Sequence, residues 1–167
     1  MLNWKSQLLR KNNSPSLSVN DAKILCCYAT GEEMSCDFGV WFPYERLSST
    51  EALQLYSRLC DGESSLARPH PAVEAFYNEL VAKYPEIDTV EDDRIDDHDY
   101  CPWSCALDYS PGHVIMACVW SKADYVGELV HSLARKHGLA VYDPQSERIT
   151  YPDVDSTSKK RPWWRIW

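Results

Sequence analysis

The stretch His113–Gln145, HVIMACVWSKADYVGELVHSLARKHGLAVYDPQ, determines the fold expected of this chain. It begins with His113–Trp120, a continuous apolar run rich in Val and Ile and of the length of a buried strand. Leu139–Tyr142 is a second, shorter apolar run, and it ends at Asp143-Pro144. Because the residues between the two runs have helical periodicity, the stretch predicts strand, helix and strand with almost no spare residues.

The predicted helix has a start signal, a stop signal and one apolar face. Ser121 occupies the N-cap position, and Asp124 follows three residues later as a variant of the capping box. Lys136 and His137 fall in the last turn, where cations favour the helix dipole, and Gly138 is the expected C′ residue. The apolar face consists of residues at helical spacing: Tyr125, Val126, Leu129, Val130, Leu133 and Ala134.

Two further helices are predicted before this stretch. Ser48 and Glu51 form a capping-box pattern, and Gly62 ends the helix that follows them. Pro71 occupies the first-turn position of the next helix, which Pro85 terminates. Their apolar faces are Ala52, Leu55, Tyr56 and Leu59 in the first helix, and Val73, Phe76, Tyr77, Leu80, Val81 and Tyr84 in the second.

Four more apolar runs are candidate strands. Lys23–Ala29 and Cys36–Phe42 suggest a hairpin. Cys105–Tyr109 precedes a turn into His113, and Arg148–Tyr151 is a last edge strand. Together the elements predict an α+β domain: a mostly antiparallel sheet of four or five strands, with three helices packed mainly on one face. This order is compatible with a ferredoxin-like arrangement.

Length and charge limit the organisation and the partners of the chain. Its 167 residues fit one domain, which we place at 23–152, between a polar N-terminal extension at 1–22 and a basic Trp-rich tail at 153–167. The net charge of −8 argues against nucleic-acid binding and favours a basic protein partner. With no apolar run of roughly 18–20 residues and no apolar segment behind the basic N-terminus, we expect a cytoplasmic protein without a membrane span. The oligomeric state stays open.

The chain has seven cysteines, an odd number that we interpret as reduced thiols, several of them in predicted strands or helices. Cys101 and Cys105 have His98 and His113 nearby, but no second pair completes a zinc-binding motif. We therefore expect no metal ion and no cofactor.

The segment 86–99, EIDTVEDDRIDDHD, carries eight acidic side chains and a single basic one, Arg94. One interpretation is a solvated loop, since so many like charges repel each other. Calcium binding fits poorly, because the spacing lacks the glycine and the terminal glutamate of an EF-hand. Another interpretation is a docking surface for a basic protein. The predicted partner-binding residues are Glu91, Asp92, Asp93, Asp96, Asp97 and Asp99, together with Trp103, Trp163 and Trp164.

The tail DVDSTSKKRPWWRIW interleaves basic and aromatic residues, a pattern that suits a membrane surface or a single-stranded nucleic acid. Because the tail is short and the rest of the chain is acidic, we instead expect its tryptophans to pack on the body of the protein or on a partner, with its cations paired to the acidic segment 86–99. The basic and aromatic residues are Lys159, Lys160, Arg161 and Arg165, with Trp163, Trp164 and Trp167.

No catalytic residue is predicted, because the chain has no nucleophile elbow, phosphate-binding loop, H-E-x-x-H motif or dinucleotide fingerprint. The alternative function is a small hydrolase or a thiol-dependent enzyme with a pocket near Trp103. It would draw on Cys101 or Cys105 with a histidine as base. The other polar candidates are Ser104, His113, Ser121, His137, Asp143 and Gln145.

Residues 36–152 also carry a recurring order of short motifs. A strand ending in Val40-Trp41 comes first, then a P-x-V-x-x-F helix at Pro71, a D-x-x-P-W segment at Asp99, and HGL-x-x-YDPQ at His137. This order resembles a family of small, largely uncharacterised bacterial proteins, which are themselves loosely similar to immunity-type proteins of toxin systems. The resemblance implies a shared fold. It also implies a cytoplasmic protein-binding module, an immunity protein that neutralises a cognate bacterial toxin or effector.

Overall fold

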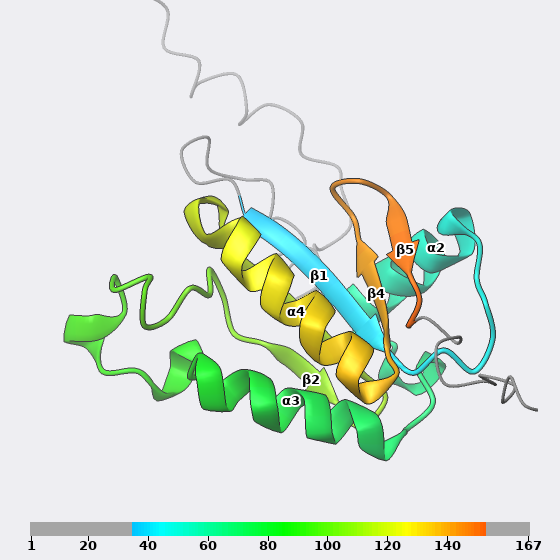
Figure 1. The fold of residues 1–167 in the computed structure, drawn as a ribbon, viewed down its shortest axis with the longest axis horizontal. Coiled ribbons are helices and arrows are strands. Elements are labelled where there is room, and N and C mark those ends of the chain that lie inside the picture. The colour runs from blue at the N-terminus through cyan, green and yellow to red at the C-terminus, as the bar shows by residue number, and fades with distance from the viewer. Residues whose placement is uncertain (1–34, 153–167) are drawn as a thin grey trace, which may run out of the picture.

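A computed structural model of the chain describes residues 35–152, and these residues form one antiparallel sheet with three α-helices. The α+β class is therefore confirmed (Figure 1). The extension 1–22, the predicted strand Lys23–Ala29 and the tail 153–167 lie outside the described residues. The sheet has the order β2-β3-β1-β4-β5, and its strands are β1 (Ser35–Trp41), β2 (Asp108–Ser110), β3 (His113–Val119), β4 (Ala140–Asp143) and β5 (Arg148–Thr150).

β1 is the central strand and pairs with a neighbour on each side. Along β3, Cys36 lies opposite Cys118 and Trp41 lies opposite His113, while on the other side Trp41 lies opposite Ala140 of β4. Both neighbours are antiparallel to β1, so β3 and β4 run in the same direction with β1 between them. Helix α4 (Ala123–His137) connects β3 to β4 across one face of the sheet (Figure 1). This split β-α-β unit is compatible with a ferredoxin-like arrangement.

The prediction that three helices pack mainly on one face is wrong. Helices α3 (Pro71–Lys83) and α4 cover one face, and α2 (Ser49–Cys60) covers the other. The reason is that β1, β3 and β4 carry large apolar side chains on both faces, and each face needs a cover. The core under α3 and α4 includes Phe38, Val40, Phe76, Leu80, Met116, Val126 and Val130, and the core under α2 includes Trp41, Ala52, Leu59, Ala140 and Tyr142.

Most predicted helix ends are confirmed. Ser48 and Glu51 form a complete capping box at the start of α2, and Pro71 is the first residue of α3. His70 is the N-cap of α3, with its Nδ1 accepting a hydrogen bond from the Ala72 N–H at 3.2 Å. Gly138 ends α4 with φ 71°, a left-handed conformation that favours glycine.

The predicted N-cap of α4 at Ser121 is wrong. Trp120–Lys122 form a 3₁₀ turn, η5, and α4 begins at Ala123 with Lys122 as an N-cap that makes no side-chain capping bond. The Lys122 ammonium group pairs instead with Asp99, so a contact distant in sequence fixes the residue before the helix.

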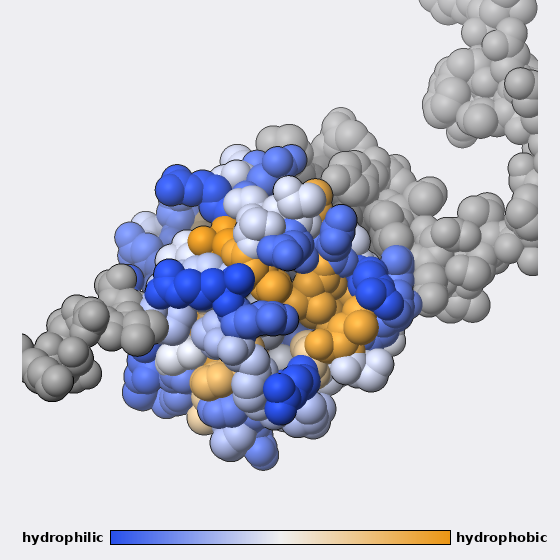
Figure 2. Space-filling model, turned by 90° about the vertical axis from the view of Figure 1, so that its right-hand side faces the viewer, coloured by the Kyte–Doolittle hydropathy of each residue, from blue (hydrophilic) through white to orange (hydrophobic). Residues whose placement is uncertain are grey.

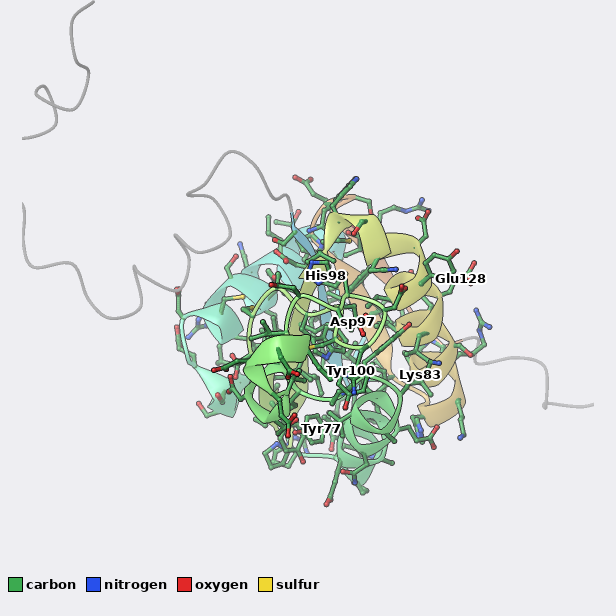
Figure 3. The ribbon with its side chains drawn as sticks, turned by 90° about the vertical axis from the view of Figure 1, so that its left-hand side faces the viewer. Tyr77, Lys83, Asp97, His98, Tyr100 and Glu128 are labelled. Atoms are coloured by element: carbon green, nitrogen blue, oxygen red, sulfur yellow. The ribbon has the colours of Figure 1, made fainter. Side chains whose placement is uncertain are left out.

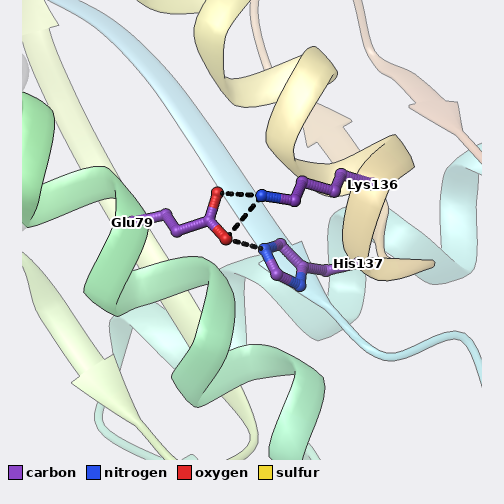
Figure 4. A network of polar contacts seen from close by, with 3 residues as sticks. All are labelled: Glu79, Lys136 and His137. Carbon is purple, nitrogen blue, oxygen red and sulfur yellow. Dashed lines mark hydrogen bonds and ion pairs between the residues drawn. The ribbon is translucent and has the colours of Figure 1, made fainter.

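Glu79 of α3 joins the two helices on the same face (Figure 4). Both of its carboxylate oxygens accept hydrogen bonds from the Lys136 ammonium at 2.7 Å, and Nε2 of His137 lies 3.2 Å from Oε1. The hydrogen bonds from Lys136 are the main reason that the pKa of the Glu79 carboxyl is lowered. The carboxylate is therefore ionised at neutral pH and stabilises the end of α4.

We expect Glu79→Gln to lower the free energy of unfolding at pH 7 and to have no effect in acid. A lowered pKa contributes stability above the ordinary glutamate value of about 4.3, and this contribution is lost as the pH falls through the native pKa. Urea unfolding at pH 7 and pH 3 measures the difference. Glu74→Gln, an exposed substitution on the same helix, is the control. A pH-independent difference for Glu79→Gln would contradict this role.

Gly112, in the turn between β2 and β3, lies against the segment that precedes α3. A Cβ atom at this position would lie 2.0 Å from the Ala67 carbonyl oxygen, which is closer than atoms can approach. The His70 N–H also donates to the Pro111 carbonyl at 3.0 Å, so the turn is held against this segment. Only glycine allows the approach without a backbone shift.

We expect Gly112→Ala to lower the free energy of unfolding by about 1–3 kcal/mol, the typical cost of overpacking a tight site. The matched control is Gly127→Ala in α4, where a Cβ atom would meet Phe38 at an ordinary 3.4 Å. In a helix interior that change should leave stability unchanged or raise it by up to about 1 kcal/mol. Thermal and urea unfolding of both variants provide the comparison, and equal effects would disprove the close contact at Gly112.

Candidate functional site

The acidic segment after α3 has a defined backbone rather than the form of an extended loop. Two 3₁₀ turns, η3 (Ile87–Thr89) and η4 (Asp92–Arg94), divide it. The Arg94 N–H donates to the Glu91 carbonyl, and the Cys101 N–H donates to the Asp97 carbonyl. These local hydrogen bonds fix the backbone that carries the acidic side chains.

Arg94, the one cation of this segment, has partners within it. Its guanidinium carbon lies 3.5 Å from the centre of the Tyr100 ring, a cation–π contact, and Nη2 lies 3.7 Å from Oδ2 of Asp97. At the end of the segment, Asp99 pairs with Lys122 of η5, and this hydrogen bond lowers the pKa of the Asp99 carboxyl. Arg94 and Lys122 therefore each pair with one carboxylate of the segment, Asp97 and Asp99. Most of the negative charge of the segment stays uncompensated.

All of the acidic residues predicted to bind a partner are exposed. Figure 3 shows Asp97, His98 and Tyr100 near the middle of one side of the molecule, with Lys83 and Glu128 at its flank. Side chains with uncompensated charge of one sign attract a partner of opposite charge and raise its association rate. The exposed carboxylates are Glu91, Asp92, Asp93, Asp96, Asp97 and Asp99.

Trp103, the other predicted binding residue in this region, lies in the core with only 2% of its surface exposed. Its Nε1 donates to the Tyr84 carbonyl at 3.4 Å, and its ring packs edge-on against the Tyr84 ring. The Ser104 N–H bonds to Ala117, which adds this segment to the edge of β3. As a correction to the sequence analysis, the Trp103 ring is part of the core, packs against the end of α3 at Tyr84, and has no free surface for a partner.

Two exposed aromatic residues beside the acidic segment were not identified as candidates from the sequence. Trp120 is 52% exposed and Tyr125 is 69% exposed. Their neighbour Lys122 pairs with Asp99, and the Val119 N–H bonds to the Pro102 carbonyl, so these contacts join η5 and α4 to the end of the segment. We call Glu91–Tyr100 together with Trp120, Lys122 and Tyr125 the acidic–aromatic face.

An apolar groove lies beside α2, where β1 ends (Figure 2). Its volume is about 650 Å³, and in Figure 2 apolar side chains gather on this side of the molecule between hydrophilic ones. Pockets that bind small molecules are typically about 300–1,000 Å³. The apolar side chains that line the groove include Trp41, Phe42, Leu47, Leu53, Leu55 and Leu66.

The rim of the groove is aromatic. The Phe42 and His70 rings stack with centroids 3.6 Å apart, and the Arg68 guanidinium carbon lies 4.3 Å from the centre of the Tyr44 ring. The Tyr44 hydroxyl donates to the Pro69 carbonyl at 2.9 Å, which holds the rim against the segment before α3. The sequence offered one signal of this site: Leu53 is an apolar residue outside the buried stripe of α2, and it is 39% exposed.

The structure does not favour Cys101 as the nucleophile of a thiol-dependent enzyme, whereas Cys105, the other predicted candidate, is exposed. Cys101 is fully buried, and burial raises the pKa of its thiol. The raised pKa keeps the thiol protonated, and a protonated thiol is a poor nucleophile. Cys36 and Cys118 are buried as well, and their pKa values are raised to about 11 and about 12, mainly by burial. Trp103 does not line the groove.

The remaining polar candidates have separate structural contacts. Oγ of Ser110 accepts hydrogen bonds from the Gly112 and His113 N–H groups at 3.2 Å, so its own proton points to His113 Nδ1 at 2.8 Å. His113 is fully buried beneath this turn. Asp143 Oδ1 accepts the Gln145 N–H at 2.9 Å in the turn after β4. These residues, together with His137 beside Glu79, are not brought together at one site.

The predicted role of Trp163 and Trp164 in partner binding stays a prediction. Trp163 and Trp164 lie outside the described residues. Between residues 35 and 152, no group of three or more His, Cys, Asp or Glu side chains is placed to hold a metal ion.

Comparison with known proteins does not place the chain in a family. No family model, no curated protein and no solved structure matches it. Over the described range, no helix is long and apolar enough to cross a membrane. The resemblance of residues 36–152 to small bacterial proteins therefore stays a prediction.

Proposed function

We propose that the chain is a protein-binding module whose acidic–aromatic face docks a basic protein. The observation that carries the proposal is the combination of six exposed carboxylates with two exposed aromatic side chains, Trp120 and Tyr125. Protein interfaces are enriched in aromatic residues, which contribute much of the binding energy when a partner buries them. A surrounding rim of charge selects the partner and speeds its approach.

The contacts beneath the face suit it to binding without a large rearrangement. Arg94 stacks on Tyr100 within the segment, Lys122 of η5 pairs with Asp99, and the buried Cys101 bonds back to the Asp97 carbonyl. A surface that is already in its binding conformation loses less conformational entropy when a partner docks. The proposal therefore assigns binding to the exposed side chains and support to the buried ones.

The partner class follows from charge and from the resemblance stated above. A net charge of −8 and an uncompensated acidic face favour a basic protein. Together with the motif order of residues 36–152, this supports a cytoplasmic immunity protein that neutralises a cognate bacterial toxin or effector. Co-expression and pull-down with the product of a neighbouring toxin-like gene tests the assignment, and the absence of both binding and protection would disprove it.

We expect Asp92→Lys combined with Asp96→Lys to slow association with that gene product by about tenfold or more at low salt, because electrostatic steering raises on-rates by roughly 10–10³-fold. Neither carboxylate makes a side-chain contact that holds the segment together, so the fold should be unaffected. Association rates measured by surface plasmon resonance at several salt concentrations should converge for wild type and variant as the salt concentration rises.

The control is Glu74→Lys combined with Glu147→Lys, which changes the net charge equally at exposed positions away from the face. Equal slowing in both double variants would show that overall charge, and not this face, steers the partner.

Tyr125→Ala tests the contribution of the exposed aromatic side chains. We expect it to weaken the binding free energy by more than about 1 kcal/mol, seen as faster dissociation.

A further inference from the structure

We propose that the apolar groove beside α2 is the docking site of this chain's own C-terminal segment, residues 163–167, with the sequence WWRIW. The groove and the acidic–aromatic face share no residue, so this inference is independent of the proposed function. The occupant is identified by the chemistry of the groove, by the place where the described chain ends, and by charge.

The chemistry of the groove fits aromatic side chains. Trp41 and four leucines line the groove, so an indole ring placed there loses contact with water on the side that faces them. Burying a large aromatic side chain removes about 150–250 Å² from water. The rim formed by Phe42, Tyr44 and His70 presents further rings for edge-on or stacked contacts.

One of the last described residues, Tyr151, is tied by its side chain to the groove. The Tyr151 hydroxyl accepts the Leu47 N–H at 2.5 Å and donates to the Leu47 carbonyl at 3.0 Å, and Leu47 itself lines the groove. Arg46 also lies over the Tyr151 ring at 5.0 Å. The Tyr151 side chain is therefore tied to a residue of the groove, while Pro152 lies beside His131 and Arg135 of α4.

The length of the tail is sufficient for docking. Ten residues separate Pro152 from Trp163, and a flexible linker of that length would have a root-mean-square span of about 17 Å. A tether of this kind gives an effective concentration in the millimolar range, so even a weak intrinsic affinity fills the site. The N-terminal segment is a poorer candidate, because it enters at Ser35, at the other end of β1 and about 20 Å from the groove.

Charge favours the same occupant. Two carboxylates line the groove: Glu45 is exposed, and Glu51 has a lowered pKa because it accepts hydrogen bonds from Ser48. The two cations of the groove already have partners, since Arg58 pairs with Glu63 and Arg68 lies over Tyr44. The tail brings the cations that Glu45 and Glu51 lack: Lys159, Lys160, Arg161 and Arg165.

The experiment compares the full chain with a full-length variant carrying Trp163→Ser, Trp164→Ser and Trp167→Ser. Methyl NMR of leucine-labelled protein reads the groove directly, because an indole ring shifts the signals of methyl groups that it contacts. We expect the Leu47, Leu53 and Leu66 signals to move between the two proteins and the Leu129 signal, on the opposite face, to stay. Leu53→Ser, at an exposed position, should release the tail indole N–H signals without unfolding the protein.

Trp120→Ser, which removes an exposed tryptophan far from the groove, is the control and should leave the groove signals unchanged. Glu45→Lys should weaken docking, seen as groove signals that move toward those of the triple variant. Identical groove signals in wild type and triple variant would overturn the proposal. Groove signals that revert on dilution would also overturn it, because the occupant would then be a second copy of the chain.

Discussion

The fold depends on the fact that β1 buries apolar side chains on both faces of the sheet. Successive side chains of a strand point to opposite faces: in β1, Phe38 and Val40 lie on one face, and Trp41 lies on the other, where Tyr142 of β4 adds a second large ring. A sheet with two apolar faces must be covered twice, so α3 and α4 pack on one face and α2 on the other. A shift of one residue in the β1–β3 register would send each set to the wrong helix layer, which is why a single register is strongly specified.

Local signals in the sequence were sufficient for most of the elements. The capping box at Ser48, Pro71 at the first turn of α3 and Gly138 after α4 each satisfy backbone groups within a few residues, and each was predicted. The failures involved contacts between distant segments. Lys122 precedes α4 in place of a capping Ser121 because Asp99 holds it, and the placement of α2 depends on which face the other helices leave uncovered.

The candidate functional site could be predicted only in part, because contacts between distant segments also determine which of its side chains are exposed. Charge density is visible in a sequence, so the exposed carboxylates of the acidic segment were identified, whereas burial of Trp103 and exposure of Trp120 and Tyr125 depend on tertiary packing. The groove has no local signature beyond Leu53. The β1–β3 register places the two surfaces apart: Ser35 pairs with Val119 next to the acidic–aromatic face, and Trp41 pairs with His113 next to the groove. They lie about 20 Å from each other along the strands.

The short edge strands of the sheet limit how a protein partner can bind. β2 and β5 form the two edges of the described sheet, and each is three residues long. A peptide that binds by strand addition needs a longer row of open backbone groups, and short edge strands also protect a sheet from unwanted pairing with other chains. A protein partner would therefore have to recognise side chains rather than backbone. Its specificity would be open to change by single substitutions on either surface, without any cost to the pairing of the strands.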